Sequence, residues 1–278
     1  MTREVGRAVR VGGLDGVLLA RSERGDGRHQ VVSSELGGRA VVLKVYGRKR
    51  ARLPTVLRGF GHRFLVGKTG LSARERRDTE RRLLELWREH GFAVPAPLAL
   101  DPPERIAAPF LVMERLAGPT VDVRLRDAGA DPAPALARFA GEWSRRHGLA
   151  ERLREPGLVH AHPGFAHLLE AGGAWAAFDF EYAYTDRARV AELVDVEIAG
   201  FVASLRRAAG ARAPALLRAL VTGYPERARL ERAARAGAIG RFRALEPLAQ
   251  RLPALRGRGP RKLRESVAAL ADALELGG

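Results

Sequence analysis

The chain has 278 residues, of which 46% are hydrophobic and 29% are charged, so it can bury a globular core and is not generally disordered. It contains no cysteine, which excludes a disulfide scaffold, a thiolate zinc site and a cysteine nucleophile. It has neither a run of about eighteen apolar residues nor a long apolar segment near the N-terminus. We therefore expect a cytoplasmic protein without a membrane span or a secretory signal.

The net charge predicts an anionic partner. Lysine and arginine number 48 against 32 acidic residues, which gives a formal charge of +16. Segment 48–70 holds seven of the basic residues and no acidic one, with apolar residues between them. This pattern favours a surface that faces anions, such as an anionic membrane surface or a phosphorylated substrate, and a plain solvated face is the alternative. Dedicated nucleic-acid recognition is not expected, because no helix-turn-helix pair, aromatic RNA-binding motif or zinc finger is present.

The N-terminal part of the chain reads as short strands. Segments 16–20, 29–33 and 39–46 are rich in valine and leucine and are separated by glycine and polar residues. In the third segment, RAVVLKVY, the alternation of side chains puts Lys44 on one face. Three apolar residues fall on the opposite face: Val41, Leu43 and Val45.

A helix is predicted to follow the basic segment. Ser72 with Glu75 three residues later forms a capping box, and Gly91 is a natural end. Four residues at helical spacing form one stripe that we expect to face inward: Glu80, Leu83, Leu84 and Trp87. Glu85 and Glu89 compete with Glu80 for a functional role.

Further along the chain, helices dominate. A buried strand is predicted over 108–116, a helix over 131–147, and a hairpin around Gly172 that leads into the strand AWAAFDFE. From residue 187 onward the chain is almost entirely helix-forming. The pattern indicates an α+β protein whose strands concentrate in the N-terminal part.

Three charged residues occur in an order that suits phosphoryl transfer. Lys44 lies in an apolar strand, Glu80 on the inward stripe of the next helix, and Asp179 at the end of a strand after a hairpin. Phosphoryl transfer depends mostly on positioning and charge neutralisation. Positioning and charge neutralisation can be supplied by a fixed cation, an anion that orients it and a carboxylate that binds a metal. Taken singly, Lys44 as an outward strand residue and Asp179 as a turn cap remain alternatives.

This order resembles the protein-kinase-like fold, and segment 44–98 resembles the bacterial lipopolysaccharide kinases, both the Kdo kinases and the core heptose kinases. The similar strings are KVYGRKRARLPTVLRGFGHRFL and DTERRLLELWREHGFAVPAP, followed by APFLVMERLAG, HAHPGFAHLL and AAFDFEYA. The resemblance covers about residues 43–184. It implies a two-lobe fold, with a β-rich N-lobe over 1–116 that carries one key helix and a mainly helical C-lobe over 117–278.

The resemblance also implies roles for individual residues in an enzyme that uses ATP and Mg²⁺. Lys44 would contact the α- and β-phosphates and Glu80 would hold Lys44, while Glu114 would lie near the adenine. Asp179 would bind magnesium with the assistance of His167. The acceptor would be a sugar hydroxyl on an anionic glycolipid.

The predicted catalytic loop departs from the kinase pattern. His160 keeps the first place of the motif, but His162 stands where the catalytic Asp belongs, and His167 stands at the Asn place. The covering loop over 20–27 also lacks the pattern G-x-G-x-x-G. A kinase-like protein that binds nucleotide in a regulatory role, without turnover, is therefore an alternative. A zinc or iron site built from the three histidines is a further one.

Overall fold

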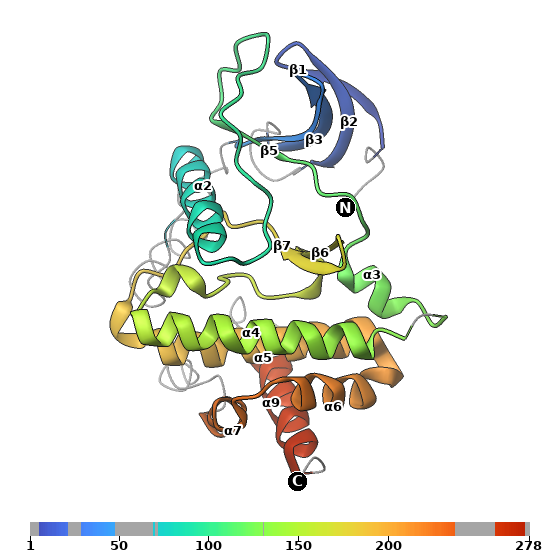
Figure 1. The fold of residues 1–278 in the computed structure, drawn as a ribbon, viewed down its shortest axis with the longest axis vertical. Helices are drawn as coiled ribbons and strands as arrows, with labels where there is room; N and C mark the ends of the chain where they lie inside the picture. The colour runs from blue at the N-terminus through green and yellow to red at the C-terminus, as the bar shows by residue number, and fades with distance from the viewer. Residues whose placement is uncertain are drawn as a thin grey trace, which may run out of the picture. The chain divides into compact units, whose positions relative to one another are not determined.

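A computed structural model describes residues 6–21, 29–47, 69, 72–129, 131–236 and 259–275 (Figure 1). The described chain is an α+β protein, as predicted. It divides into two compact units: Met1–Ala117 with Ala176–Thr185, and Gly118–Trp175 with Asp186–Gly278. Apart from Thr69, the basic segment 48–70 lies outside the described residues, as do residues 22–27 of the predicted covering loop.

The first unit is built on an antiparallel sheet of five strands in sequence order. The strands are β1 (Ala8–Val11), β2 (Leu14–Arg21), β3 (Gln30–Leu36), β4 (Arg39–Val45) and β5 (Phe110–Glu114). In β4, Lys44 pairs with Val31 of β3 and with Leu111 of β5. The three residues predicted to share one face of β4 are buried together in a single core cluster, which also includes Leu14 and Val112.

Helix α2 (Ala73–Glu89) completes the first unit and begins at the predicted capping box. The Ser72 hydroxyl accepts a hydrogen bond from the backbone N–H of Glu75, whose carboxylate in turn accepts one from the N–H of Ser72. All four residues of the predicted inward stripe are buried. The helix ends at His90, and Gly91 follows in the left-handed conformation, with φ of 72°.

The second unit is mainly helical (Figure 1). Its main helices are α3 (Val121–Arg126), α4 (Ala133–Leu153), α5 (Val190–Ala209), α6 (Ala213–Gly223), α7 (Arg227–Ala236) and α9 (Gly259–Glu275). Helix α4 packs against α6, and α5 packs against α6, α7 and α9. Strands β6 (Leu168–Ala171) and β7 (Ala174–Ala177) form the predicted hairpin. Among the described helices, none combines the length and apolarity that crossing a bilayer requires.

The prediction and the structure differ mainly at four places. The predicted strand AWAAFDFE is shorter in the structure, because β7 ends at Ala177 and Asp179 follows it. Strand β1 and helix α3 were not predicted, since each is too short to carry a periodic pattern. Helix α4 continues six residues beyond His147, because the sequence GLAERL after it contains no proline and favours a helix apart from one glycine. The helix ends at Arg154, which adopts the left-handed conformation, with φ of 51°.

Candidate functional site

Lys44 is the centre of a buried charged cluster in the first unit. Its side chain is only 6% exposed. The ammonium Nζ donates to Glu80 Oε2 at 2.8 Å and to Asp179 Oδ1 at 2.7 Å. It also lies 3.2 Å from Glu181 Oε1. A buried ammonium needs such counter-charges, because leaving water unpaired would cost several kcal/mol.

Helix α2 brings Glu80 to this lysine. Glu80 is a buried residue of the inward stripe, and both of its carboxylate oxygens accept from Lys44. The Tyr46 hydroxyl donates to Glu80 Oε2 at 2.7 Å. The structure therefore selects Glu80 rather than Glu85 or Glu89 as the partner of Lys44.

The pKa values agree with an ionic cluster. Burial acts to lower the pKa of Lys44, but the charges of Asp179 and Glu80 outweigh it and hold this pKa well above its usual range. Burial raises the pKa of Glu80 while Lys44 acts in the opposite direction. Burial also raises the pKa of Tyr46, so its hydroxyl stays a proton donor. Lys44 is thus held in its cationic form.

Asp179 lies just after β7 in an uncommon backbone conformation. Its φ is 68°, in the left-handed region that side-chain-bearing residues seldom adopt. The flanking contacts hold it there: the N–H of Ala177 donates to the carbonyl of Ala93, and Phe180 packs edge-on against Trp87. Strain kept in place by its surroundings is typical of functional positions.

Three residues of the cluster were missed by the sequence analysis: Arg76, Glu181 and His29. Glu181 is buried and accepts from Arg76 Nη1 at 2.9 Å, and His29 Nε2 lies 3.3 Å from it. Burial acts to raise the pKa of Glu181, but Lys44, His29 and Arg76 together lower it. Two of the three had a local signal in the sequence: Arg76 is four positions before Glu80 on the same helix stripe, and Glu181 is two positions after Asp179.

The cluster has donors that suit a hard divalent cation. One carboxylate oxygen each from Glu80, Asp179 and Glu181 lies within 4.8 Å of the others. Magnesium prefers oxygen ligands of this kind. Asp179 is the most accessible of the three, and its side chain is 32% exposed. These oxygens are therefore of the type that Mg²⁺ prefers, and in this structure all three carboxylates contact the ammonium of Lys44.

The predicted catalytic loop lies in the second unit, where backbone groups connect its three histidines. The N–H of His162 donates to His160 Nδ1 at 3.1 Å. His167 Nδ1 lies 2.7 Å from the carbonyl oxygen of His162, which can only accept. Neutral His160 therefore carries its proton on Nε2, whereas neutral His167 carries it on Nδ1 and keeps a lone pair on Nε2.

The three histidines do not form a metal-ligand group in the part of the chain that the structure describes. The carboxylate trio is the group of suitable geometry there. Nδ1 of His160 already accepts a backbone hydrogen bond, and the rings of His160 and His167 stack with centroids 5.9 Å apart. This arrangement fits an ordered loop better than the zinc or iron site that the sequence left open.

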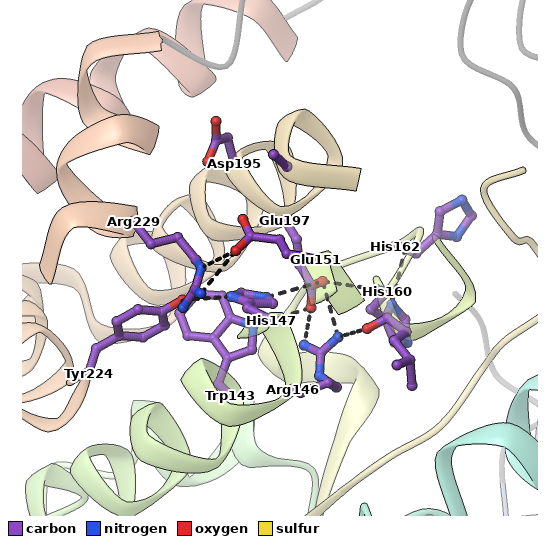
Figure 2. A network of polar contacts seen from close by, with 12 residues as sticks. Trp143, Arg146, His147, Glu151, His160, His162, Asp195, Glu197, Tyr224 and Arg229 are labelled. Atoms are coloured by element: carbon purple, nitrogen blue, oxygen red, sulfur yellow. Dashed lines mark hydrogen bonds and ion pairs between the residues drawn. The ribbon is translucent and has the colours of Figure 1, made fainter. Parts of the chain in front are cut away.

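A buried acid on α5 anchors the loop (Figure 2). Glu197 Oε2 accepts from the backbone N–H of His160 at 3.0 Å, and Arg146 of α4 forms an ion pair with the same carboxylate. Burial acts to raise the pKa of Glu197, but Arg146 and His147 lower it far below its usual range. Burial lowers the pKa of His147 to about 4, so its imidazole is neutral at pH 7.

Glu114 lies apart from the lysine cluster along the sheet. It pairs with Val41, three residues before Lys44 in β4, which corresponds to about 10 Å along the strand. Glu114 is exposed at the end of β5, and its backbone N–H donates to the carbonyl of Ala96. Of the predicted site residues, the structure therefore brings together Lys44, Glu80 and Asp179, and it places Glu114 elsewhere in the first unit. His162 and His167 belong to the second unit.

No protein-family model matches the chain, and no curated protein matches it. The grounds for proposing a function are therefore the geometry of the Lys44 cluster and of the loop that carries the three histidines.

Proposed function

We propose that the protein is a kinase-like phosphotransferase that uses ATP and Mg²⁺. The observation that carries this proposal is the buried Lys44, which bonds Glu80 and the strained Asp179 at once. The proposal includes a two-lobe kinase-like fold over 1–116 and 117–278. We also propose that the protein is related to the bacterial lipopolysaccharide kinases that its sequence resembles.

Each residue of the cluster has a role in this proposal. Lys44 binds the α- and β-phosphates, and Glu80 keeps its ammonium in place and charged. Asp179, whose carboxylate is the most accessible of the cluster, holds Mg²⁺. The ion supplies charge neutralisation for phosphoryl transfer. Glu114 lies near the adenine.

The histidine loop receives the acceptor. His162 takes the place of the catalytic base, and His167 assists Mg²⁺, as the resemblance to the kinase loop implies. An imidazole accepts a proton at neutral pH. A loose transition state demands less of the base than of the cations.

The acceptor that we propose is a sugar hydroxyl on an anionic glycolipid at the inner face of the membrane. The resemblance supports it, together with the net charge of +16 and the acid-free basic segment 48–70. The protein would work in the cytoplasm with peripheral contact at the membrane surface.

A second candidate is a kinase-like protein that binds nucleotide in a regulatory role. It is favoured by His162, since an imidazole replaces the carboxylate at the place of the base. Turnover separates the two candidates. The enzyme releases ADP in the presence of Mg²⁺ and stops when Asp179→Ala is introduced, whereas the regulatory protein binds nucleotide without Asp179-dependent release.

The first experiment is a thermal melt with and without MgATP. At one hundred times the dissociation constant, binding adds about 2.7 kcal/mol of stability, which shifts Tm by roughly 5 °C or more. The shift is expected in the wild type and in Arg39→Ala, an exposed residue of the same strand, and lost in Lys44→Ala. A wild type that does not respond to saturating MgATP would contradict both candidates.

A further inference from the structure

Arg76 is the least expected charge in the first unit. It is one of the largest fully buried side chains of the described residues, and it lies on α2 one turn before Glu80. Its guanidinium donates to Glu181 Oε2 at 2.9 Å and also to the backbone carbonyl of Gly47. A single side chain thus joins helix α2, the end of β4 and the segment after β7.

The stability of the fold does not account for this arginine. Replacing a buried ion pair by apolar side chains of similar volume is often neutral or stabilising, since both charges must leave water. Arg76 Nε has no hydrogen-bond partner among the described residues. The ring of Tyr46, 5.9 Å from the guanidinium carbon, gives partial compensation. A geometric role explains better why a charge is retained here.

The charges of the cluster suggest what that role is. Lys44 touches three carboxylates, those of Glu80, Asp179 and Glu181. If the ammonium turns to phosphate oxygens, Glu181 loses its contact with the positive charge of Lys44. Arg76 and His29 then remain as partners of that carboxylate.

We propose that Arg76 is a positioning residue, which holds the Asp179–Glu181 segment against α2 independently of Lys44. The ion pair of Arg76 with Glu181 keeps this segment in place when Lys44 engages nucleotide. The part of this inference that concerns nucleotide rests on the proposed function; the part that concerns the segment does not.

The test measures backbone hydrogen exchange of residues 179–183 without nucleotide. In Arg76→Ala we expect exchange of these amides at least tenfold faster, with the core strands β3 and β4 unchanged. Arg77→Ala is the matched control, because this neighbour on α2 pairs only with the exposed Asp78 among the described residues. Arg76→Lys separates charge from geometry. A lysine ammonium keeps the positive charge, but it does not reproduce the two contacts of the guanidinium, with Glu181 and with the carbonyl of Gly47. We expect intermediate exchange.

A second measurement links the pair to nucleotide. Arg76→Ala and Glu181→Gln are each expected to raise the Kd for MgATP about tenfold, which is 1.4 kcal/mol. The double variant should be no worse than either single one, because the two residues act as a unit. Unchanged exchange in both Arg76→Ala and Arg76→Lys would overturn the inference. A wild type that fails to bind MgATP would instead overturn the proposed function, and the exchange data would still decide the role of Arg76.

Discussion

At the scale of single residues, the candidate site depends on side chains held in unfavourable states. Lys44 is a buried cation, and Asp179 has a left-handed backbone. Both states persist because neighbours fix them: Glu80 neutralises the lysine, and Phe180 packs against Trp87 beside the aspartate. Such preorganisation lowers the cost of aligning charges during a reaction.

The strain at Asp179 can be measured with two substitutions that both remove the carboxylate. Asp179→Gly should be more stable than Asp179→Ala by about 1 kcal/mol, because glycine adopts positive φ without the Cβ clash. Chemical denaturation of the two variants gives the difference directly. At Asp78, an exposed residue in the interior of helix α2, the alanine variant should instead be the more stable one, because alanine favours a helix interior over glycine. The same order at both positions would contradict a strained Asp179.

The sequence predicted part of the site, namely the residues with clear local patterns. Lys44 stood in an apolar strand, and Glu80 stood on a helix stripe with Leu83 and Trp87. Arg76 shares that stripe, but several other arginines on the same helix obscured it. Glu197 was missed because acids on a helix are usually solvated, and only the tertiary fold shows that this one meets Arg146.

At the scale of elements, helix α4 and helix α6 approach closely through glycines. A Cβ on Gly223, the last residue of α6, would lie 2.3 Å from the carbonyl oxygen of Ala137 in α4. A Cβ on Gly141 of α4 would meet only the carbonyl of Gly223, at an ordinary 3.5 Å. The close approach of the two helices therefore requires a glycine at position 223 but leaves room for a methyl group at position 141.

Alanine at these two positions is expected to have opposite effects. Gly141→Ala should stabilise the protein by about 0.5–1 kcal/mol, because alanine favours a helix interior and the space is available. Gly223→Ala should destabilise it, since backbone atoms of α4 must move. Thermal melts of both variants and the wild type decide the matter. A stabilising Gly223→Ala would mean that α4 and α6 are not in contact there.

At the scale of the whole molecule, local patterns did not predict contacts distant in sequence, and the expectation that Lys44 and Asp179 share one site came from the order of the residues and the resemblance. Lys44 and Asp179 are 135 residues apart, and residues 176–185 belong with the first unit. Local patterns give the order of strands and helices, since periodicity and caps act over a few residues. They do not determine which distant segments meet, because that depends on the packing of all elements together.

Two buried groups of the second unit, His147 and Asp195, should change the free energy of unfolding in opposite directions when the pH is lowered. The pKa of His147 is lowered to about 4 by burial, and that of Asp195 is raised to about 6, because burial outweighs its ion pair with Arg232. Between pH 6.5 and 4 only the unfolded chain protonates His147, so the free energy of unfolding decreases as the pH is lowered. Between pH 6 and 3.8 only the folded chain protonates Asp195, so stability rises. Each contribution amounts to about 3 kcal/mol.

Because the two contributions nearly cancel in the wild type, single variants should reveal them. Relative to the wild type, Asp195→Asn should lose about 3 kcal/mol of stability between pH 7 and pH 4, and His147→Gln should gain a similar amount. Urea denaturation at several pH values measures both slopes, and other titrating groups drop out of the comparison since all variants share them. The double variant should regain the wild-type slope. Parallel pH profiles for all four proteins would mean that His147 and Asp195 titrate alike in the folded and unfolded chains, and hence that neither is buried as the structure has it.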